Sequence, residues 1–262
     1  MSLSNDAKPV PASLYDADYF LHHRGGSDEF LRTQGKEVYH AHRRAMDLAR
    51  VSPRYTVLDI GCGCGEIVFQ CALRGARAVG LDYSADALKL ANEARQHYPP
   101  EVQSRCGFAL ADAAHLPVWP RHLDRVFMLD VVEHLTASQL AALCEQAKLA
   151  MKPDGLLIIH TFPNLWHSRF LYPVTARIRR LLGQNRPLDP HTERDKLMHV
   201  NEQSCRSLKQ TLTASGFRCR VWVEVTAAGA NGGFESTARR FLGNTYPINL
   251  LFGNDIWAVA WT

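Results

Sequence analysis

The stretch VLDIGCGCG, residues 57–65, places three alternate glycines directly after a short apolar run. Glycine is needed where a chain reverses tightly after a strand, and where a ligand must touch backbone that a Cβ atom would shield. The segment from Glu66 to Arg74 has apolar residues at helical spacing, so the free N–H groups at its start face the same turn. This order of features predicts a strand, a nucleotide-binding turn and a helix.

The next apolar run, AVGLD at residues 78–82, ends in a carboxylate. Asp82 follows Gly61 by 21 residues, close to the ~20-residue offset of an acid that binds a ribose. Its two oxygens can accept hydrogen bonds from both ribose hydroxyls, and Tyr83 offers a flat face for an adenine ring. The same layout serves NAD, FAD and S-adenosylmethionine.

The spacing of the glycines separates these ligands. A dinucleotide fingerprint reads G-x-G-x-x-G and places a pyrophosphate at the helix N-terminus. Here the pattern is D-x-G-x-G-x-G from Asp59 to Gly65, which fits a ligand with a cationic aminoacyl end and no phosphate. Three further motifs follow in order: ADA at 111–113 with Leu116-Pro117, DRVFMLDVVEHL at 124–135, and LAMKPDGLLII at 149–159.

These four motifs resemble those of the S-adenosylmethionine-dependent methyltransferases of the Rossmann-like class, in the small-molecule (type 11, ubiquinone-biosynthesis-like) group. The resemblance spans roughly residues 55–164. It implies S-adenosylmethionine as the cofactor, and a set of cofactor-binding residues near the ends of the strands. Those residues are Asp59, Gly61, Cys62, Gly63, Gly65, Asp82, Tyr83, Asp112, Ala113, Leu129 and Asp130.

Strand and helix patterns alternate along the chain, which predicts parallel strands with crossover helices. We expect an α/β fold: a seven-stranded, mostly parallel Rossmann-like sheet flanked by helices, with an antiparallel last strand. The expected strands are residues 56–60, 78–82, 106–111, 125–130, 156–161, 217–225 and 255–262. The expected helices are residues 37–50, 66–74, 86–97, 137–151 and 201–215. Ligands in such sheets bind beyond the C-terminal ends of the strands.

Residues 1–36 are expected to form an N-terminal tail and cap segment, and residues 37–262 the methyltransferase domain, with a helical lid insertion at residues 165–200. In the resembling family, such an N-terminal segment folds over the cofactor and the substrate. Tyr15, Tyr19 and His40 are therefore candidate pocket residues.

The insertion is basic, with seven Arg and Lys against three Asp and Glu. Its apolar residues share one helical face: Phe170, Leu171, Val174, Ile178, Leu181 and Leu182. A basic amphipathic helix of this kind can lie on a lipid surface or cap a pocket. It can be a lid packed on the domain with solvated arginines, or can form a pocket for an anionic or lipid-linked substrate. Nucleic-acid binding is disfavoured, because aromatic residues are not interleaved with the basic ones.

The composition agrees with one domain of ordinary core size, since 46% of the 262 residues are apolar. No apolar run approaches the ~18 residues of a membrane span, and the N-terminus lacks an apolar signal region, so we expect a soluble, cytoplasmic protein. The pI near 8.7 is only mildly basic, so no nucleic-acid partner is expected. Cys62 and Cys64 form a C-x-C pair that can bind metal, but small residues between glycines are the favoured interpretation.

The resemblance also implies the chemistry. Methyl transfer is an in-line displacement at a sulfonium carbon, so the enzyme must position the nucleophile and take up a proton. His134 is the best candidate base, because its imidazole follows the fourth strand, where the substrate should meet the methyl group. His160 at the end of the fifth strand and His199 beyond the lid are further catalytic candidates.

A second resemblance involves Asp130-x-x-Glu133-His134 together with His199. It is similar to the ligand set of metal-assisted O-methyltransferases of ubiquinone biosynthesis and of small-RNA 3′-end methylation, where a divalent ion such as Mg²⁺ holds the substrate hydroxyls. The first acid here is Asp rather than Glu, and a Glu-His pair at this place also occurs in relatives without a metal. The alternative is that Glu133 and His134 cap the next turn or orient the loop, so the sequence assigns no metal ligand and leaves Mg²⁺ open.

The sequence thus predicts an S-adenosylmethionine-dependent methyltransferase that acts on a small-molecule, lipid-linked or sugar-linked acceptor. Oxygen is the favoured acceptor atom by elimination, because the Asn-Pro-Pro-Tyr type of motif for planar nitrogens is absent. A non-catalytic S-adenosylmethionine-binding protein and a metal-assisted O-methyltransferase of the quinone or RNA 3′-end type are the alternatives. A nucleotide-binding oxidoreductase is disfavoured by the glycine spacing.

Overall fold

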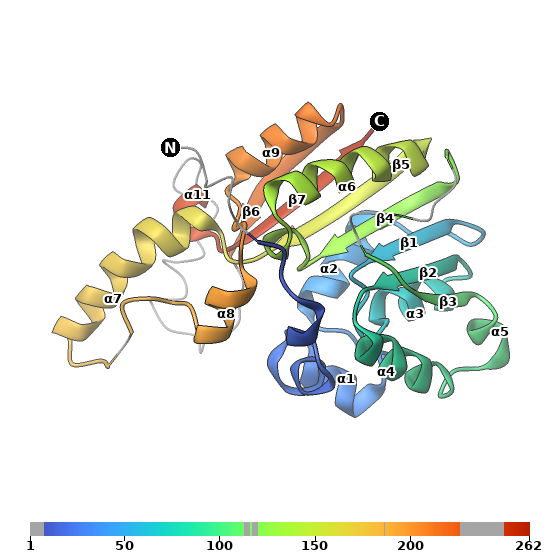
Figure 1. Ribbon diagram of the computed structural model, residues 1–262, viewed down its shortest axis with the longest axis horizontal. Coiled ribbons are helices and arrows are strands. Elements are labelled where there is room, and N and C mark those ends of the chain that lie inside the picture. Colours follow the sequence, from blue (N-terminus) through green and yellow to red (C-terminus); the bar gives the residue numbers. More distant parts are fainter. Residues whose placement is uncertain (1–7, 113–115, 117–119, 186, 226–248) are drawn as a thin grey trace.

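The computed structural model describes residues 8–112, 116, 120–185, 187–225 and 249–262. Its centre is a seven-stranded sheet with the strand order β3-β2-β1-β4-β5-β7-β6 (Figure 1). The strands are β1 Thr56–Ile60, β2 Arg77–Asp82, β3 Cys106–Leu110, β4 Leu123–Leu129, β5 Met151–Thr161, β6 Arg218–Glu224 and β7 Asp255–Trp261.

Strands β1 to β5 pair in parallel, and β7 pairs antiparallel with both β5 and β6. This arrangement confirms the expected α/β class, the mostly parallel Rossmann-like sheet and the antiparallel last strand. Because β1 lies between β2 and β4, the chain order reverses at β1, and ligands of open α/β sheets bind at such a switch point.

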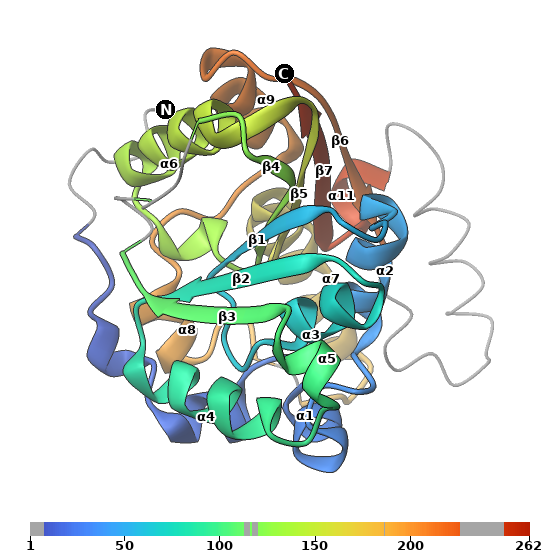
Figure 2. The ribbon, with the colours of Figure 1, turned by 90° about the vertical axis from the view of Figure 1, so that its right-hand side faces the viewer.

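Helices cover both faces of the sheet. In β4, Val126 and Met128 pack into one core, whereas Phe127 and Leu129 pack into the other, as the alternation of side chains along a strand requires. Figure 2 shows α6 and α9 on one face and α3 and α4 on the other. The main helices are α2 His40–Ala49, α3 Glu66–Leu73, α4 Ala85–Arg95, α5 Pro100–Gln103, α6 Ala137–Ala150 and α9 Cys205–Ala214.

Three element starts differ from expectation by three residues or more. Strand β5 begins at Met151 rather than residue 156, because Met151 pairs with Leu123 ahead of a register shift. Helix α9 begins at Cys205 rather than residue 201, because the Ser204 side chain accepts a hydrogen bond from the Ser207 N–H and caps the helix there. Helix α2 begins at residue 40 rather than 37.

The N-terminal segment packs against the body of the molecule. It contains η1 (Ala12–Leu14), η2 (Tyr19–His23) and α1 (Ser27–Thr33). Tyr15, Phe20 and Phe30 are buried in the same core cluster as residues of α2 and α3. The Ser84 hydroxyl donates a hydrogen bond of 2.6 Å to the Tyr15 carbonyl, so the segment is tied to the loop that follows β2. The expected boundaries of the cap segment (residues 1–36), the methyltransferase domain (37–262) and the insertion (165–200) remain predictions.

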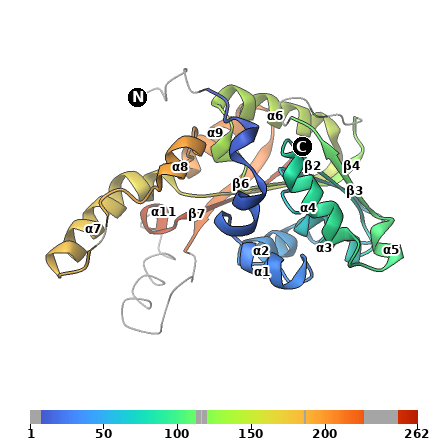
Figure 3. The same ribbon diagram turned by 60° about the horizontal axis from the view of Figure 1, so that its bottom comes forward.

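The insertion after β5 is helical, as expected, with η4 (His167–Leu171), α7 (Tyr172–Leu181) and α8 (Glu193–Met198). Helix α7 extends away from the sheet at one end of the molecule (Figure 3). Ala176 is the one residue of α7 that is buried. The expectation of a lid that packs its apolar face on the domain is therefore wrong for α7.

Two short helices complete the described chain, η3 (Val132–His134) after β4 and α11 (Asn249–Phe252) before β7. Within the described ranges, every helix falls short of the length and apolar content required to cross a bilayer.

Candidate active site

The C-terminal ends of β1, β2, β4 and β5 border a cavity of about 2130 Å³. Sites for single small ligands measure about 300–1,000 Å³. The cavity therefore has room for a nucleotide-sized cofactor and a second molecule. The N-terminal segment forms part of its wall, and Tyr15, Tyr19 and His40 all line it.

Glycines shape the turn after β1. Gly61 and Gly63 have φ values of 70° and 51°, in the left-handed region that favours glycine. A Cβ atom on Gly61 would collide with the Val131 side chain. The Gly61 and Cys62 N–H groups donate hydrogen bonds to the Leu81 carbonyl, at 2.7 and 3.0 Å. The turn is thus attached to β2, and its residues 61–63 line the cavity.

Asp82, at the end of β2, holds this turn in place by hydrogen bonds. Its Oδ2 accepts a hydrogen bond of 2.9 Å from the Gly63 N–H, and its Oδ1 accepts one of 2.8 Å from the Ser84 N–H. Burial raises the pKa of Asp82, while these N–H groups oppose the rise. A carboxylate has about four lone-pair directions, so two remain for ribose hydroxyls. Asp82 therefore can orient the turn and a ligand together.

The other expected cofactor contacts divide between the cavity wall and the core. Tyr83, Asp112, Leu129 and Asp130 line the cavity, and the Tyr83 ring lies 5.2 Å from that of Tyr15. Ala113 lies outside the described residues.

Asp59 and Gly65 are not among the lining residues. Asp59 is buried in β1, where burial raises its pKa. Gly65 has a φ of 85° at the N-terminus of α3, and a Cβ there would lie 2.7 Å from the Phe108 ring. Gly65 thus packs closely against Phe108, and a direct contact of either residue with the cofactor stays a prediction.

An ion-pair network joins the C-terminal ends of β4 and β5 to the start of β7. His160 lies with Nδ1 2.6 Å from Asp130 Oδ1 and Nε2 3.3 Å from Asp255 Oδ1. The Tyr39 hydroxyl donates a hydrogen bond of 2.7 Å to Asp130 Oδ2. Burial opposes protonation of His160, but the charge of Asp130 outweighs it and raises the pKa of His160 to about 10. His160 is therefore an imidazolium at neutral pH, which favours a positioning role over that of a general base.

This network gives a pH-dependent stability. The pKa of His160 is about 10 in the folded protein and 6.5 for an unperturbed histidine, so its stabilising contribution is present below pH 6.5 and is lost as the pH rises toward 10. We expect the free energy of unfolding in urea to fall more steeply between pH 6.5 and 10 for the wild type than for His160→Gln. The exposed His122→Gln is the control, and equal slopes for wild type and His160→Gln would contradict the assignment.

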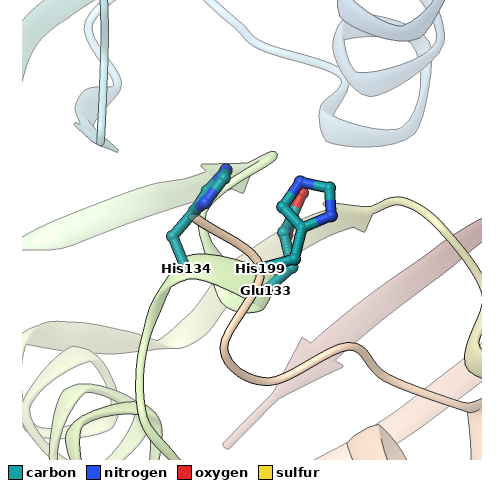
Figure 4. A group of neighbouring side chains, drawn as sticks. All are labelled: Glu133, His134 and His199. Carbon is teal, nitrogen blue, oxygen red and sulfur yellow. The ribbon is translucent and has the colours of Figure 1, made fainter. Parts of the chain in front are cut away.

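Glu133, His134 and His199 form a second cluster at the cavity wall (Figure 4). One candidate ligand atom from each side chain lies within 4.8 Å of the others. The fold creates this contact, because the Glu133 carbonyl accepts hydrogen bonds of 3.0 Å from the N–H groups of Val200 and Asn201. Asp130, tied to Tyr39 and His160, does not belong to the cluster.

The structural alternative for Glu133 and His134 had two parts. Both residues form hydrogen bonds with the loop at residues 198–201, as the loop-orienting part expects, but neither caps the next helix. Thr136 caps α6, with Gln139 completing a capping box. Glu133 is 2% exposed, and its Oε2 accepts a hydrogen bond of 2.7 Å from the Thr161 hydroxyl. Burial, reinforced by the nearby Asp130 charge, raises the pKa of Glu133 to about 7. A carboxyl group with such a pKa can accept a proton near neutral pH.

The two histidines of the cluster differ in protonation. The His134 Nδ1–H donates a hydrogen bond of 3.0 Å to the Met198 carbonyl, which leaves Nε2 as the acceptor nitrogen. Burial and the neighbouring His199 lower the pKa of His134 to about 4, so it is neutral. Burial opposes protonation of His199, but the Glu202 carboxylate raises its pKa. The buried His199 Nδ1 forms an ion pair of 3.6 Å with Glu202 Oε1, a distance beyond that of a hydrogen bond.

Several cavity residues were not anticipated from the sequence. Arg24 Nη2 lies 2.6 Å from Glu66 Oε1, and both side chains line the cavity beside the glycine turn. Tyr39 was also not anticipated, although a sequence signal existed for it. The Gly25-Gly26 pair leaves room for its ring, since a Cβ on Gly26 would lie 2.8 Å from Tyr39 Cδ1. Asp255, at the start of β7, had no such signal.

The far side of the cavity is formed by α7 and α8. Tyr172, Thr175 and Arg179 line it from α7, and Arg194 lines it from α8. The Arg194 guanidinium lies 5.7 Å from the centre of the Tyr19 ring, and its Nη1 is buried without a hydrogen-bond partner. This end of the cavity thus presents a guanidinium group with unused hydrogen-bonding capacity.

Comparison with known proteins agrees with this geometry. Residues 57–155, from β1 to the first half of β5, match the family model described as a methyltransferase domain. Residues 57–155 of the chain therefore form a methyltransferase domain. This domain holds the glycine turn, Asp82, Asp130 and two members of the Glu133–His134–His199 cluster.

Curated relatives match over ranges longer than this domain. The chain is 30% identical over 175 residues to the biotin biosynthesis bifunctional protein BioHC of Cellvibrio japonicus, covering 66% of this chain and 30% of the relative. It is 30% identical over 123 residues to the ubiquinone biosynthesis O-methyltransferase of Rhodopseudomonas palustris, covering 46% and 45%. The chain thus spans less than half the length of these relatives.

A solved structure shares the fold over most of both chains. The S-adenosylmethionine-dependent methyltransferase from Archaeoglobus fulgidus has a TM-score of 0.53 and 22% identity, covering 85% of this chain and 93% of that one. The agreement extends the shared fold beyond the residues of the family match.

Proposed function

We propose that this protein transfers the methyl group of S-adenosylmethionine to an oxygen atom of a small or lipid-linked acceptor. The observation that carries the proposal is the placement of the buried Glu133 carboxyl group, with a pKa of about 7, in the same cavity as the glycine turn and Asp82. A cofactor site and a proton acceptor thus share one cavity.

The cofactor fits the β1 and β2 side of the cavity. Asp82 is placed to accept the ribose hydroxyls, and Tyr83 offers its ring to the adenine. Arg24 and Glu66 form an oppositely charged pair beside Gly63, suited to the carboxylate and ammonium of the aminoacyl end. One wall of the cavity thus offers a complementary side chain to the ribose, the adenine and the aminoacyl end of S-adenosylmethionine.

The acceptor oxygen attacks the sulfonium methyl carbon, so a C–O bond forms and the C–S bond breaks to leave the neutral thioether of S-adenosylhomocysteine. The acceptor hydroxyl must lose its proton, and Glu133 is placed to take it. Thr161 holds Oε2 of Glu133 by a hydrogen bond, which leaves Oε1 for this task. His134, with a neutral ring and a free Nε2, is placed to orient the hydroxyl.

The Glu133–His134–His199 cluster also fits a divalent ion. The Met198 carbonyl orients His134 with Nε2 free, as a metal ligand requires, and His199 Nδ1 lies 3.6 Å from the Glu202 carboxylate, which can orient the His199 ring from outside the cluster. Two imidazoles and one carboxylate suit Mn²⁺, Fe²⁺ or Zn²⁺ better than Mg²⁺, which prefers oxygen ligands. When bound, such an ion lowers the pKa of an acceptor hydroxyl.

Metal binding is testable without an acceptor. We expect titration calorimetry with Mn²⁺ or Zn²⁺ to detect one site in the wild type, weakened about tenfold or more in His199→Asn, since loss of one ligand removes a metal–nitrogen bond. The exposed His122→Asn is the matched control. Equal affinity in wild type and His199→Asn would exclude this site and leave Glu133 as a metal-free proton acceptor.

The function itself is tested by label transfer. Methyl-labelled S-adenosylmethionine is incubated with the protein and a panel of phenols, catechols, sugar alcohols and hydroxylated lipids, with aliphatic amines in parallel. We expect label on a hydroxyl compound. Label on amines alone would overturn oxygen as the acceptor atom, and binding of S-adenosylhomocysteine without transfer to the whole panel would favour a non-catalytic binding protein.

A further inference from the structure

Helix α7, together with Phe170 of η4 and Leu182 just after the helix, exposes a large apolar face. Leu181 and Leu182 are 88% and 73% exposed, and Phe170, Val174 and Ile178 are each more than half exposed. At helical spacing these residues share one side, and Figure 3 shows α7 extending from the body of the molecule. Contiguous exposed apolar patches mark a surface that contacts another apolar phase or partner.

Positive charge borders this apolar face. Arg169, Arg177 and Arg180 lie on the same short segment, and the sequence contains no Asp or Glu between Asp154 and Asp189. Arg177 and Arg180 precede Ile178 and Leu181 by one residue each, which places them along one border of the apolar face. An apolar face with a basic border matches a lipid surface that carries negative headgroups.

Other occupants fit the charge less well. A second copy of the chain would bring two arginine borders together, and like charges at an interface oppose association. Packing of this face on the protein's own core would leave Leu181 and Leu182 buried, and they are among its most exposed apolar residues.

The opposite side of α7 faces the cavity. Tyr172, Thr175 and Arg179 line the cavity, and Ala176 between them is buried. These residues lie about half a helical turn away from Ile178 and Leu181. A surface in contact with the apolar face would therefore lie beside the acceptor end of the cavity.

We propose that α7 is a membrane-surface helix that docks the protein on an anionic bilayer, so that an amphiphilic acceptor enters the cavity from the lipid. The docking is inferred from α7 and its flanking residues and does not depend on the proposed function, whereas the entry of an acceptor rests on that function. The arginines attract the headgroups, and the leucine face enters the boundary with the acyl chains. The substrate class implied by this docking is a lipid-soluble or lipid-linked hydroxyl compound.

Co-sedimentation with vesicles tests the docking. The full chain is mixed with phosphatidylcholine vesicles with and without phosphatidylglycerol. We expect binding to the anionic vesicles only, lowered about tenfold or more in the double variant Ile178→Asp, Leu181→Asp, because both residues then resist entering the lipid. Arg177→Gln with Arg180→Gln should weaken binding and make it less sensitive to salt. Leu149→Asp, at an exposed leucine of α6, is the control.

Three results would overturn the docking: no binding of the wild type to anionic vesicles, equal binding by the double variant, or a wild-type dimer in sedimentation velocity that the double variant loses while neither binds vesicles. Calorimetry with S-adenosylhomocysteine separates this from the proposed function. Retained cofactor affinity without vesicle binding removes only the membrane proposal, whereas vesicle binding without cofactor affinity removes only the methyltransferase activity.

Discussion

Replacement of Glu133 by Gln is expected to lower kcat for methyl transfer by about 10²–10⁴-fold, the usual contribution of a positioned proton acceptor. The amide keeps the shape of the side chain and can still accept the hydrogen bond of 2.7 Å from Thr161, but it cannot take up a proton. If a divalent ion occupies the cluster, the same change also removes its one charged ligand. The rate of label transfer to the acceptor found in the panel measures the effect.

The affinity for S-adenosylhomocysteine should change little in Glu133→Gln, because Glu133 lies at the acceptor side of the cavity. Glu145→Gln on the exposed surface of α6 removes the same charge and serves as the control. A kcat within a few-fold of the wild type in Glu133→Gln would exclude Glu133 as proton acceptor and as an essential ligand. His134→Gln would then be the next variant, since His134 offers the other free lone pair.

Asp82→Ala is expected to raise the Kd for S-adenosylhomocysteine by about 100-fold or more. Two hydrogen bonds between the carboxylate and the ribose hydroxyls are lost, each worth about 1.5–3 kcal/mol because one partner is charged. The Gly63 and Ser84 N–H groups also lose their acceptor, so the turn is less well oriented. Titration calorimetry measures the affinity.

Asp82→Asn separates ligand contact from support of the turn. The amide oxygen can keep one of the two backbone hydrogen bonds, so the fold should tolerate it better than Ala, while the ribose still loses a charged acceptor. Asp154→Ala, exposed at the start of β5, is the control, and thermal unfolding checks each variant. Unchanged affinity in a folded Asp82→Ala would refute the ribose assignment.

The two halves of the cavity differ in how they are built. The cofactor half consists of a glycine turn and a carboxylate held by backbone hydrogen bonds between adjacent parallel strands. The acceptor half combines Glu133 and His134 of the matched methyltransferase domain with side chains of α7, α8 and the N-terminal segment, which lie outside that domain. The acceptor is therefore the property that the family match constrains least.

Much of the cofactor half was predictable from the sequence, because its signals are local. The period of apolar residues, the glycine positions and the offset of Asp82 from Gly61 all lie within one strand–helix–strand unit. Right-handed crossovers then leave few ways to arrange parallel strands. Helix and strand starts were less predictable, as Ser204 shows, since side-chain capping rather than apolar period sets where α9 begins.

The sequence by itself determined the sheet, the turn and the position of Asp82, because neighbouring residues enforce them. Only the tertiary structure decided which distant side chains meet: His199 with Glu133, Asp255 with His160, and Tyr39 with Asp130. The same contacts decided that His160 is charged and His134 neutral, because a pKa depends on burial and on nearby charges. The exposure of α7 was also decided by the tertiary structure, because an apolar helical pattern does not determine whether another element covers the apolar face.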